Sequence, residues 1–309
     1  MRGEADRSVP HAFTTSLKAD PVFKTLSAHD YFETQYVLRK SLPSFHEHVA
    51  EWEALSEDRC FSAHSFHIER YGEHPRQTLE VFKAAPGEMG KGLAIFIHGG
   101  FWRAMQREQS RFMATPFLKR GYDCVIAEYR LMPEFRLKDL VDDTVAALRH
   151  LAEGSARLML SSAKIIAGHS AGAHLAVYGT AQARKEGVAL GETALLLFSG
   201  VFDIFPVQGT SIGDELAMQR DEVAAWSLYS GADLGGQRTA YVVGGAETDD
   251  FQRQTFLAAQ ILGRGKEECI FSVDTANHLT VLTAFARNDA LCDAVLAALG
   301  HPSADAATR

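Results

Sequence analysis

The chain has 309 residues, a formal net charge of −8, and 46% hydrophobic and 23% charged residues. These values are ordinary for a globular protein with a large core, and the acidic balance argues against nucleic-acid binding, which usually needs a basic surplus. Four widely spaced cysteines form no Cys-x-x-Cys pair, so we expect reduced thiols in a cytosolic protein, without a disulfide framework or a metal site. They are Cys60, Cys124, Cys269 and Cys292.

The two ends of the chain are rich in polar or small residues, so residues 1–25 and 301–309 are expected to be loose. Residues 26–300 are expected to form a single domain. The N-terminus lacks the apolar core of a signal peptide, and no apolar run reaches transmembrane length. We therefore expect a cytoplasmic protein that does not bind membranes.

The predicted elements begin with a helical segment over about 28–56, followed by short strands at 66–71 and 78–84. Strands then alternate with helices, which predicts an α/β fold with a mainly parallel, twisted sheet and helices on both faces. Apolar runs such as Leu93–Ile97 are typical of strands covered on both sides. Further strands are expected at 124–127, 162–167, 194–198, 240–243 and 269–273, and helices at 106–120, 137–151, 173–179, 251–262 and 280–299. Ligands of such sheets bind at the carboxyl ends of the strands.

The junction between the strand ending at Ala167 and the next helix carries the pattern Gly-x-Ser-x-Gly, in Gly168-His169-Ser170-Ala171-Gly172. Strand, tight turn and helix is the context in which a serine is exposed on a sharp elbow as a nucleophile. The pattern also occurs by chance in many chains, so partners of Ser170 must be sought at the other strand ends.

A glycine turn, His98-Gly99-Gly100-Phe101-Trp102, follows the strand that ends at Ile97. Its glycines leave the N–H groups of Gly99 and Gly100 unobstructed, and the N–H of Ala171 is a third candidate donor to an oxyanion. A plain glycine turn is the alternative, but two motifs at adjacent strand ends favour an oxyanion hole. Phe101 and Trp102 are candidate walls of the substrate pocket, with loop packing as the alternative for Phe101.

A serine hydroxyl needs a base, and the chain has 13 histidines, so position must discriminate. The order of a triad with this elbow is serine, acid, histidine, which selects His278 after the last predicted strand. The other candidates are predicted to lie on the surface upstream (His46, His48, His64, His67), to shape the glycine turn (His98), to point away from the serine (His169, His174) or to lie in the tail (His301).

Three carboxylates compete for the role of the acid, in Gly244-Gly245-Ala246-Glu247-Thr248-Asp249-Asp250. Glu247 lies closest to the preceding strand and is the predicted acid, which orients His278 and stabilises its imidazolium. Asp249 and Asp250 are expected in the first turn of the next helix, where carboxylates favour the positive end of the helix dipole.

Together these residues resemble the α/β-hydrolase superfamily over roughly residues 30–300. Within it the chain is most similar to the kynurenine formamidase (arylformamidase) group, close to hormone-sensitive-lipase-type esterases. The glycine turn is the sharpest match, because such esterases usually carry a third glycine and formamidases an aromatic pair ending in tryptophan. Other matching stretches are Tyr71-Gly72, Tyr129-Arg130-Leu131-Met132-Pro133, Gly168–His174, Phe251-Gln252-Arg253-Gln254 and Asn277-His278.

Two positions depart from the family pattern. Glu247 stands where the family usually has aspartate, so Asp249 remains an alternative acid. Tyr36-Val37-Leu38-Arg39 replaces a stretch that in relatives often reads Tyr-Asn-x-Arg, which leaves the substrate open.

The resemblance implies a serine hydrolase of tryptophan catabolism that needs no metal or cofactor. Its substrate would be an N-formyl or N-acyl arylamine such as N-formylkynurenine, cleaved through an acyl-serine. A short-acyl carboxylesterase and an amidase for another acylated amine are the alternatives. A non-catalytic ligand receptor on the same fold is disfavoured, because Ser170 and His278 are both present. A homodimer is an expectation from the family alone.

Overall fold

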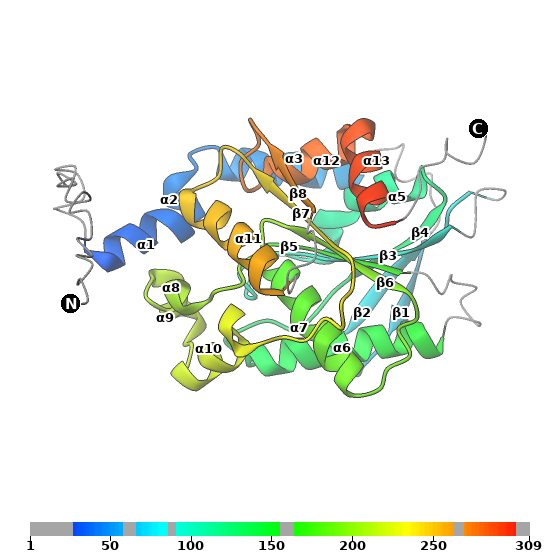
Figure 1. Ribbon diagram of the computed structural model, residues 1–309, viewed down its shortest axis with the longest axis horizontal. Coiled ribbons are helices and arrows are strands. Elements are labelled where there is room, and N and C mark those ends of the chain that lie inside the picture. Colours follow the sequence, from blue (N-terminus) through cyan, green and yellow to red (C-terminus); the bar gives the residue numbers. More distant parts are fainter. Residues whose placement is uncertain (1–26, 58–65, 86–90, 155–163, 263–268, 301–309) are drawn as a thin grey trace, which may run out of the picture.

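The computed structural model describes residues 27–57, 66–85, 91–154, 164–262 and 269–300. Within these residues one sheet of eight strands has the order β1-β2-β4-β3-β5-β6-β7-β8 (Figure 1). Strands β3 to β8 pair in parallel, whereas β1 and β2 form an antiparallel edge. The strands are β1 Phe66–Arg70, β2 Thr78–Phe82, β3 Gly92–Ile97, β4 Tyr122–Ala127, β5 Lys164–His169, β6 Thr193–Phe198, β7 Thr239–Gly244 and β8 Cys269–Val273.

Helices cover both faces of the sheet, as the sequence predicts. Figure 1 shows α6 and α7 on one face and α3, α12 and α13 on the other. The helices are α1 Ala28–Tyr36, α2 Leu38–Ser41, α3 Phe45–Glu57, η2 Arg107–Ala114, α5 Thr115–Leu118, α6 Leu137–Glu153, α7 Ala171–Lys185, α8 Phe205–Gln208, α9 Ser211–Leu216, α10 Arg220–Trp226, η3 Leu228–Ser230, α11 Asp249–Leu262, α12 Thr280–Arg287 and α13 Asp289–Ala298. None of the described helices is long and apolar enough to cross a membrane.

The strands are apolar along their whole length because each strand contributes side chains to two separate parts of the core. Along β3, Leu93, Ile95 and Ile97 pack in one buried cluster, whereas Ala94 and Phe96 pack in another. Successive strand residues point to opposite faces, so a strand covered on both sides is apolar throughout. This confirms the predicted fold class.

Several predicted elements differ in their boundaries. The segment predicted as helical over 28–56 comprises three helices, α1, α2 and α3. The segment predicted as one helix over 106–120 is a 3₁₀-helix followed by a short α-helix, and Pro116, which has no N–H to donate, lies in the first turn of that second helix. Helix α7 continues through Gly179 to Lys185, because Gly179 serves close packing: a Cβ there would lie 2.3 Å from Thr144 Cγ2 of α6. The predicted last helix is divided at Asn288, whose extended backbone and side chain cap α13.

Some predictions fall outside the described residues. These are the loose ends 1–25 and 301–309, the first two residues of the strand predicted at 162–167, and Cys60, His64 and His301. The single domain over 26–300 stays a prediction. Cys124 and Cys292 are buried free thiols among the described residues.

Candidate active site

Ser170 occupies a sharp elbow between β5 and α7, with φ 55° and ψ −118°. This left-handed conformation is costly for a residue with a side chain, and it persists only where the surrounding structure fixes it. The two glycines of the motif allow the close backbone contacts that hold Ser170 in this conformation. A Cβ at Gly168 would lie 2.2 Å from the Gly172 carbonyl oxygen. A Cβ at Gly172 would lie 2.1 Å from the Ile97 carbonyl oxygen. The close approach of β3, β5 and α7 thus requires both glycines.

His278 and Glu247 form a buried pair next to the last two strands. The Nδ1 atom of His278 lies 2.7 Å from Glu247 Oε2, and both residues are buried. Glu247 lies in the turn between β7 and α11, and His278 in the turn between β8 and α12. The structure brings them together because β7 and β8 are parallel neighbours that end in register at Gly244 and Val273.

Asp249 and Asp250, the competing carboxylates, occupy the first turn of α11. Asp249 is exposed, and Asp250 is buried with one oxygen 2.8 Å from Arg253 Nε. Of the three carboxylates, Glu247 is therefore the one that the structure places against His278 Nδ1.

Ser199, which directly follows β6, supports the other oxygen of Glu247. Its hydroxyl donates to Glu247 Oε1, which also accepts a hydrogen bond of 2.7 Å from the Gly244 N–H. Ser199 is fully buried and has a left-handed φ of 45°. Sequence reasoning missed this residue, because a serine after a strand carries no signal of its own and its partner lies 48 positions further on.

Aromatic rings flank the imidazole of His278 on two sides. The Phe251 ring lies 4.0 Å away between centroids, and the His169 ring 4.7 Å away. His169 Nε2 lies 2.8 Å from the His278 carbonyl oxygen, so this nitrogen carries the proton. Burial, and then the nearby His278, hold the pKa of His169 well below its ordinary value. His169 is therefore neutral.

His174, on the other side of the serine, is also buried and neutral. Its Nε2 lies 2.7 Å from the Trp226 carbonyl oxygen, and burial lowers its pKa to about 4. Among the remaining described histidines that were predicted at the surface, His46 and His67 are exposed and His48 is half-buried.

The glycine turn after β3 lies directly against the serine. A Cβ at Gly99 would lie 3.2 Å from Ser170 Cβ. Gly100, Phe101 and Trp102 all have positive φ, of 101°, 48° and 56°. Ala171 is the first residue of α7, so its N–H has no partner within the helix. The register explains this proximity, because Ile97 of β3 pairs with Gly168 of β5.

The two aromatic residues of the turn differ in burial. Trp102 is fully buried, its ring lies edge-on to His174 at 5.2 Å, and its Nε1 has no hydrogen-bond partner among the described residues. Phe101 is half-buried and packs against the same core. Ser170 and His278 are only 2% and 3% exposed, so the site is enclosed in this conformation. Both pocket-wall assignments stay predictions.

The helix α1 lies beside α8 and α11 (Figure 1). Tyr36, at its end, is fully buried, and its hydroxyl lies 2.5 Å from Gln254 Nε2 of α11. The Tyr36 ring also packs at 5.5 Å against Phe251, the ring that covers His278. The segment that departs from the family pattern therefore lies one side chain away from the candidate base.

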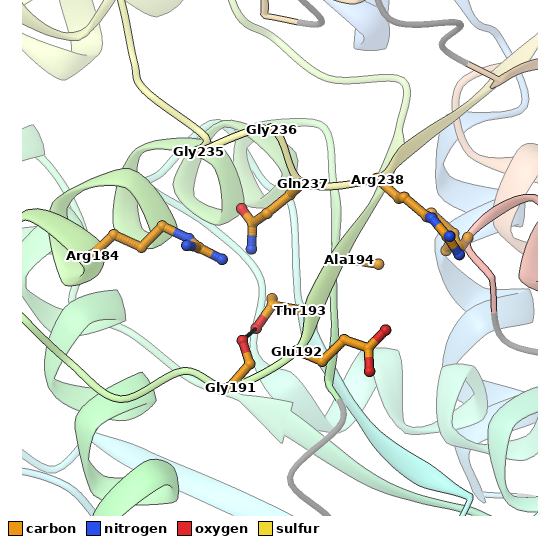
Figure 2. A pocket seen from close by; sticks show the side chains of 10 residues that line it. Arg184, Gly191, Glu192, Thr193, Ala194, Gly235, Gly236, Gln237 and Arg238 are labelled. Carbon is orange, nitrogen blue, oxygen red and sulfur yellow. Dashed lines mark hydrogen bonds between the residues drawn. The ribbon is translucent and has the colours of Figure 1, made fainter.

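A polar cleft of about 260 Å³ lies at the opposite end of the sheet, where β6 and β7 begin (Figure 2). Arg184, Gln237 and Arg238 are among the residues that line it, and none of the candidate site residues does. Figure 2 shows the Arg184 side chain pointing toward Gln237 and Arg238 pointing away from both. The described residues contain no cluster of three or more potential metal ligands.

Comparisons with known proteins support an α/β-hydrolase fold of the kynurenine formamidase-like and esterase group. Residues 79–205 match the BD-FAE family model. The kynurenine formamidase of Salmo salar is 25% identical over 221 residues, which cover 69% of this chain and 74% of that protein. The kynurenine formamidase of Danio rerio is 28% identical over 156 residues, and the match covers about half of each chain, 50% and 52%. A thermophilic esterase from Thermogutta terrifontis superimposes with a TM-score of 0.62 at 20% identity, over 78% of this chain and 96% of that one, which shows a shared fold.

Proposed function

We propose that this chain, an α/β-hydrolase of the kynurenine formamidase-like and esterase group, hydrolyses N-formyl or N-acyl arylamines such as N-formylkynurenine through an acyl-serine on Ser170. The observation that carries the proposal is the buried Glu247–His278 pair, placed at neighbouring strand ends with the Ser170 elbow and the Gly99 turn. The similarity to kynurenine formamidases supports the choice of substrate.

The first half of the proposed reaction forms the acyl-enzyme. Ser170 attacks the carbonyl carbon while its proton passes to Nε2 of His278, since Nδ1 is already bonded to Glu247. Glu247 remains ionised and stabilises the imidazolium. The N–H groups of Gly99, Gly100 and Ala171 bind the new oxyanion, and each such donor lowers the barrier by roughly 3 kcal/mol.

The second half releases the two products. His278 returns the proton to the departing amine, and an arylamine leaves readily because its lone pair is delocalised into the ring. Water then attacks the acyl-serine, and His278 accepts its proton and passes it to Ser170. The acid product is formate when the acyl group is formyl. This sequence of steps needs no metal or cofactor.

The deciding experiment compares kcat/KM on N-formylkynurenine with kcat/KM on p-nitrophenyl acetate. We expect the formamide value to equal or exceed the ester value. A formamide value far below the ester value would show a short-acyl carboxylesterase instead. A matched panel of formyl and acetyl arylamines beside the corresponding esters identifies the acyl group, and detects an amidase for another acylated amine.

We also propose that the protein acts in the cytoplasm, in tryptophan catabolism, as a homodimer that takes small-molecule substrates. Cell fractionation and light scattering test the location and the oligomeric state. Labelling by a fluorophosphonate probe separates an enzyme from a ligand receptor on the same fold, because only an activated serine reacts.

A further inference from the structure

Three buried side chains, those of His98, Glu128 and Tyr129, hold the glycine turn through hydrogen bonds. His98 Nδ1 lies 2.8 Å from the Gly99 carbonyl oxygen, and His98 Nε2 lies 2.9 Å from Glu128 Oε1. The Tyr129 hydroxyl lies 3.0 Å from the carbonyl oxygens of both His98 and Gly99, which share its single proton. The Tyr129 ring stacks on the His98 ring at 4.4 Å. The described contacts of His98 thus tie the turn to the end of β4.

Parallel pairing brings these residues together. Ile97 of β3 pairs with Ala127 of β4, so His98 and Glu128 leave the sheet side by side. Tyr129 begins the Tyr129–Pro133 stretch, which matches the kynurenine formamidase group in sequence and has no role in the proposed mechanism. The same stretch makes a second contact with the turn, because the Met132 N–H donates to the Trp102 carbonyl oxygen at 2.8 Å.

Glu128 is ionised although it is only 2% exposed. Its carboxylate accepts hydrogen bonds from Arg76 Nη2, from the Arg107 N–H and from the Tyr129 N–H. Burial by itself raises the pKa of Glu128, but the interactions with His98, Arg76 and the Arg107 N–H outweigh burial and lower it below its ordinary value.

Both nitrogens of the His98 ring lie against atoms that accept hydrogen bonds. A backbone carbonyl oxygen only accepts hydrogen bonds, and an ionised carboxylate also only accepts them. Nδ1 lies against the Gly99 carbonyl oxygen and Nε2 against the Glu128 carboxylate. Only a doubly protonated ring, an imidazolium, donates to both atoms.

The carbonyls that receive these bonds belong to the peptide groups of the oxyanion donors. The His98 carbonyl shares its peptide with the Gly99 N–H, and the Gly99 carbonyl shares its peptide with the Gly100 N–H. Hydrogen bonds in a chain polarise one another, so a donor at the carbonyl oxygen strengthens the N–H on the other side of the same peptide. A charged donor does so more strongly than a neutral one.

We infer that Tyr129 and the His98–Glu128 ion pair are positioning residues, which orient and polarise the N–H groups of Gly99 and Gly100. The inference rests on the proposed function, in which these N–H groups bind the oxyanion. Their donor strength acts on the transition state and leaves the bound substrate nearly unaffected, so it affects kcat and spares KM.

The test is Tyr129→Phe, with Tyr71→Phe as its matched control. The Tyr129 change removes the hydroxyl and keeps the ring that stacks on His98. The Tyr71 hydroxyl donates at 2.6 Å to the Glu128 carbonyl oxygen, which is outside the turn, so its loss is the same chemical change in the same region. We expect Tyr129→Phe to lower kcat on p-nitrophenyl acetate about tenfold at unchanged KM, and Tyr71→Phe to leave both constants unchanged.

A transition-state analogue separates polarisation from a general loss of structure. Phenylboronic acid forms a tetrahedral adduct with an active serine. We expect its Ki to rise for Tyr129→Phe by the same factor as kcat/KM falls. An unchanged Ki, or an equal loss in both variants, would overturn the inference. If the wild type neither hydrolyses the ester nor binds the boronic acid, the proposed function fails and the inference falls with it.

The charge of His98 is tested on the wild-type protein, so that no variant needs to fold. The groups that face the His98 ring and its partner are Glu128, Arg76, Tyr129 and the Arg107 N–H. Nitrogen-15 spectra at neutral pH should show both ring nitrogens of His98 protonated. A neutral tautomer would remove the ion pair from the inference.

Discussion

The two loops that flank Ser170 have opposite tasks in the proposed reaction. The turn after β3 is proposed to stabilise negative charge with its backbone N–H groups, and the side chains of His98 and Tyr129 bond to its carbonyl oxygens. The turn after β7 is proposed to stabilise the positive charge of His278 with the Glu247 side chain, whose other oxygen accepts from the Gly244 N–H. A loop that acts through its backbone N–H groups needs glycine. A loop that acts through a side chain needs only a carboxylate in the right position.

The two loops also differ in the charge that supports them. On the oxyanion side, His98 and Arg76 both bond to Glu128. On the base side, Glu247 is held by the neutral donors Ser199 and Gly244. In the proposed transition state, the negative substrate oxygen and the positive His278 would each meet a complementary charge.

Removing the residue between the two loops should have the largest effect. Ser170→Ala leaves both loops intact and removes the nucleophile, so we expect kcat to fall by roughly 10⁵- to 10⁶-fold. Labelling by a fluorophosphonate should disappear with it. Labelling that persists in this variant would show that the nucleophile is another residue, and the comparison of the two loops would no longer apply.

The side-chain loop is tested by Glu247→Gln, compared with Asp249→Asn. The glutamine keeps the size of Glu247 but does not hold His278 in the productive tautomer, so we expect kcat to fall by roughly 10⁴-fold. Asp249 is exposed at the start of α11, and its loss should change kcat less than about threefold, an effect of the size expected for a surface charge. The opposite ranking would move the acid to Asp249.

The backbone loop is tested by Gly99→Ala. The new Cβ would lie 3.0 Å from His169 Nδ1 and 3.2 Å from Ser170 Cβ, so the turn must shift away from the serine. We expect kcat/KM to fall by roughly 10²-fold, the usual effect of losing one oxyanion donor. Gly209→Ala is the control, because its Cβ would meet only an ordinary contact at 3.6 Å. Equal activities of the two variants would count against Gly99 as a donor.

The difference between the loops also explains what the sequence predicts. The Gly99 turn and the Ser170 elbow are visible because their backbone geometry demands glycines at fixed spacing. The sequence does not decide between Glu247 and Asp249, because either side chain is long enough to be considered as the partner of His278. Ser199 carries no motif, and the stretch that begins at Tyr129 matches the family without a stated role, because only the pairing of β5 with β6 and of β3 with β4 brings these residues to the site.

The same reasoning applies to the fold. Strands with both faces covered are apolar throughout, and their sequences therefore predict the sheet well. The helices α8, α9 and α10 have only four to seven residues each, too few for a helical period to appear. The predicted end of α7 at Gly179 is wrong for another reason. Gly179 allows a close contact with Thr144 of α6 and does not end α7.

The smallest expected effect concerns the two buried histidines, one on each side of Ser170. His174 packs against Trp102 on the oxyanion side, and His169 against His278 on the base side. The pKa of His174 is lowered from 6.5 to about 4, so the unfolded chain binds a proton more readily than the folded one. The stabilisation is complete above pH 6.5 and is lost as the pH falls toward 4, by about 3 kcal/mol in total.

The measurement is urea unfolding of the wild type and His174→Gln at pH 7 and pH 4. Glutamine retains an N–H for the Trp226 carbonyl oxygen but does not titrate, so its free energy of unfolding should fall less between these pH values. His67→Gln is the control, because the His67 side chain is 47% exposed. Equal pH dependence in all three proteins would show that His174 is not held neutral by burial.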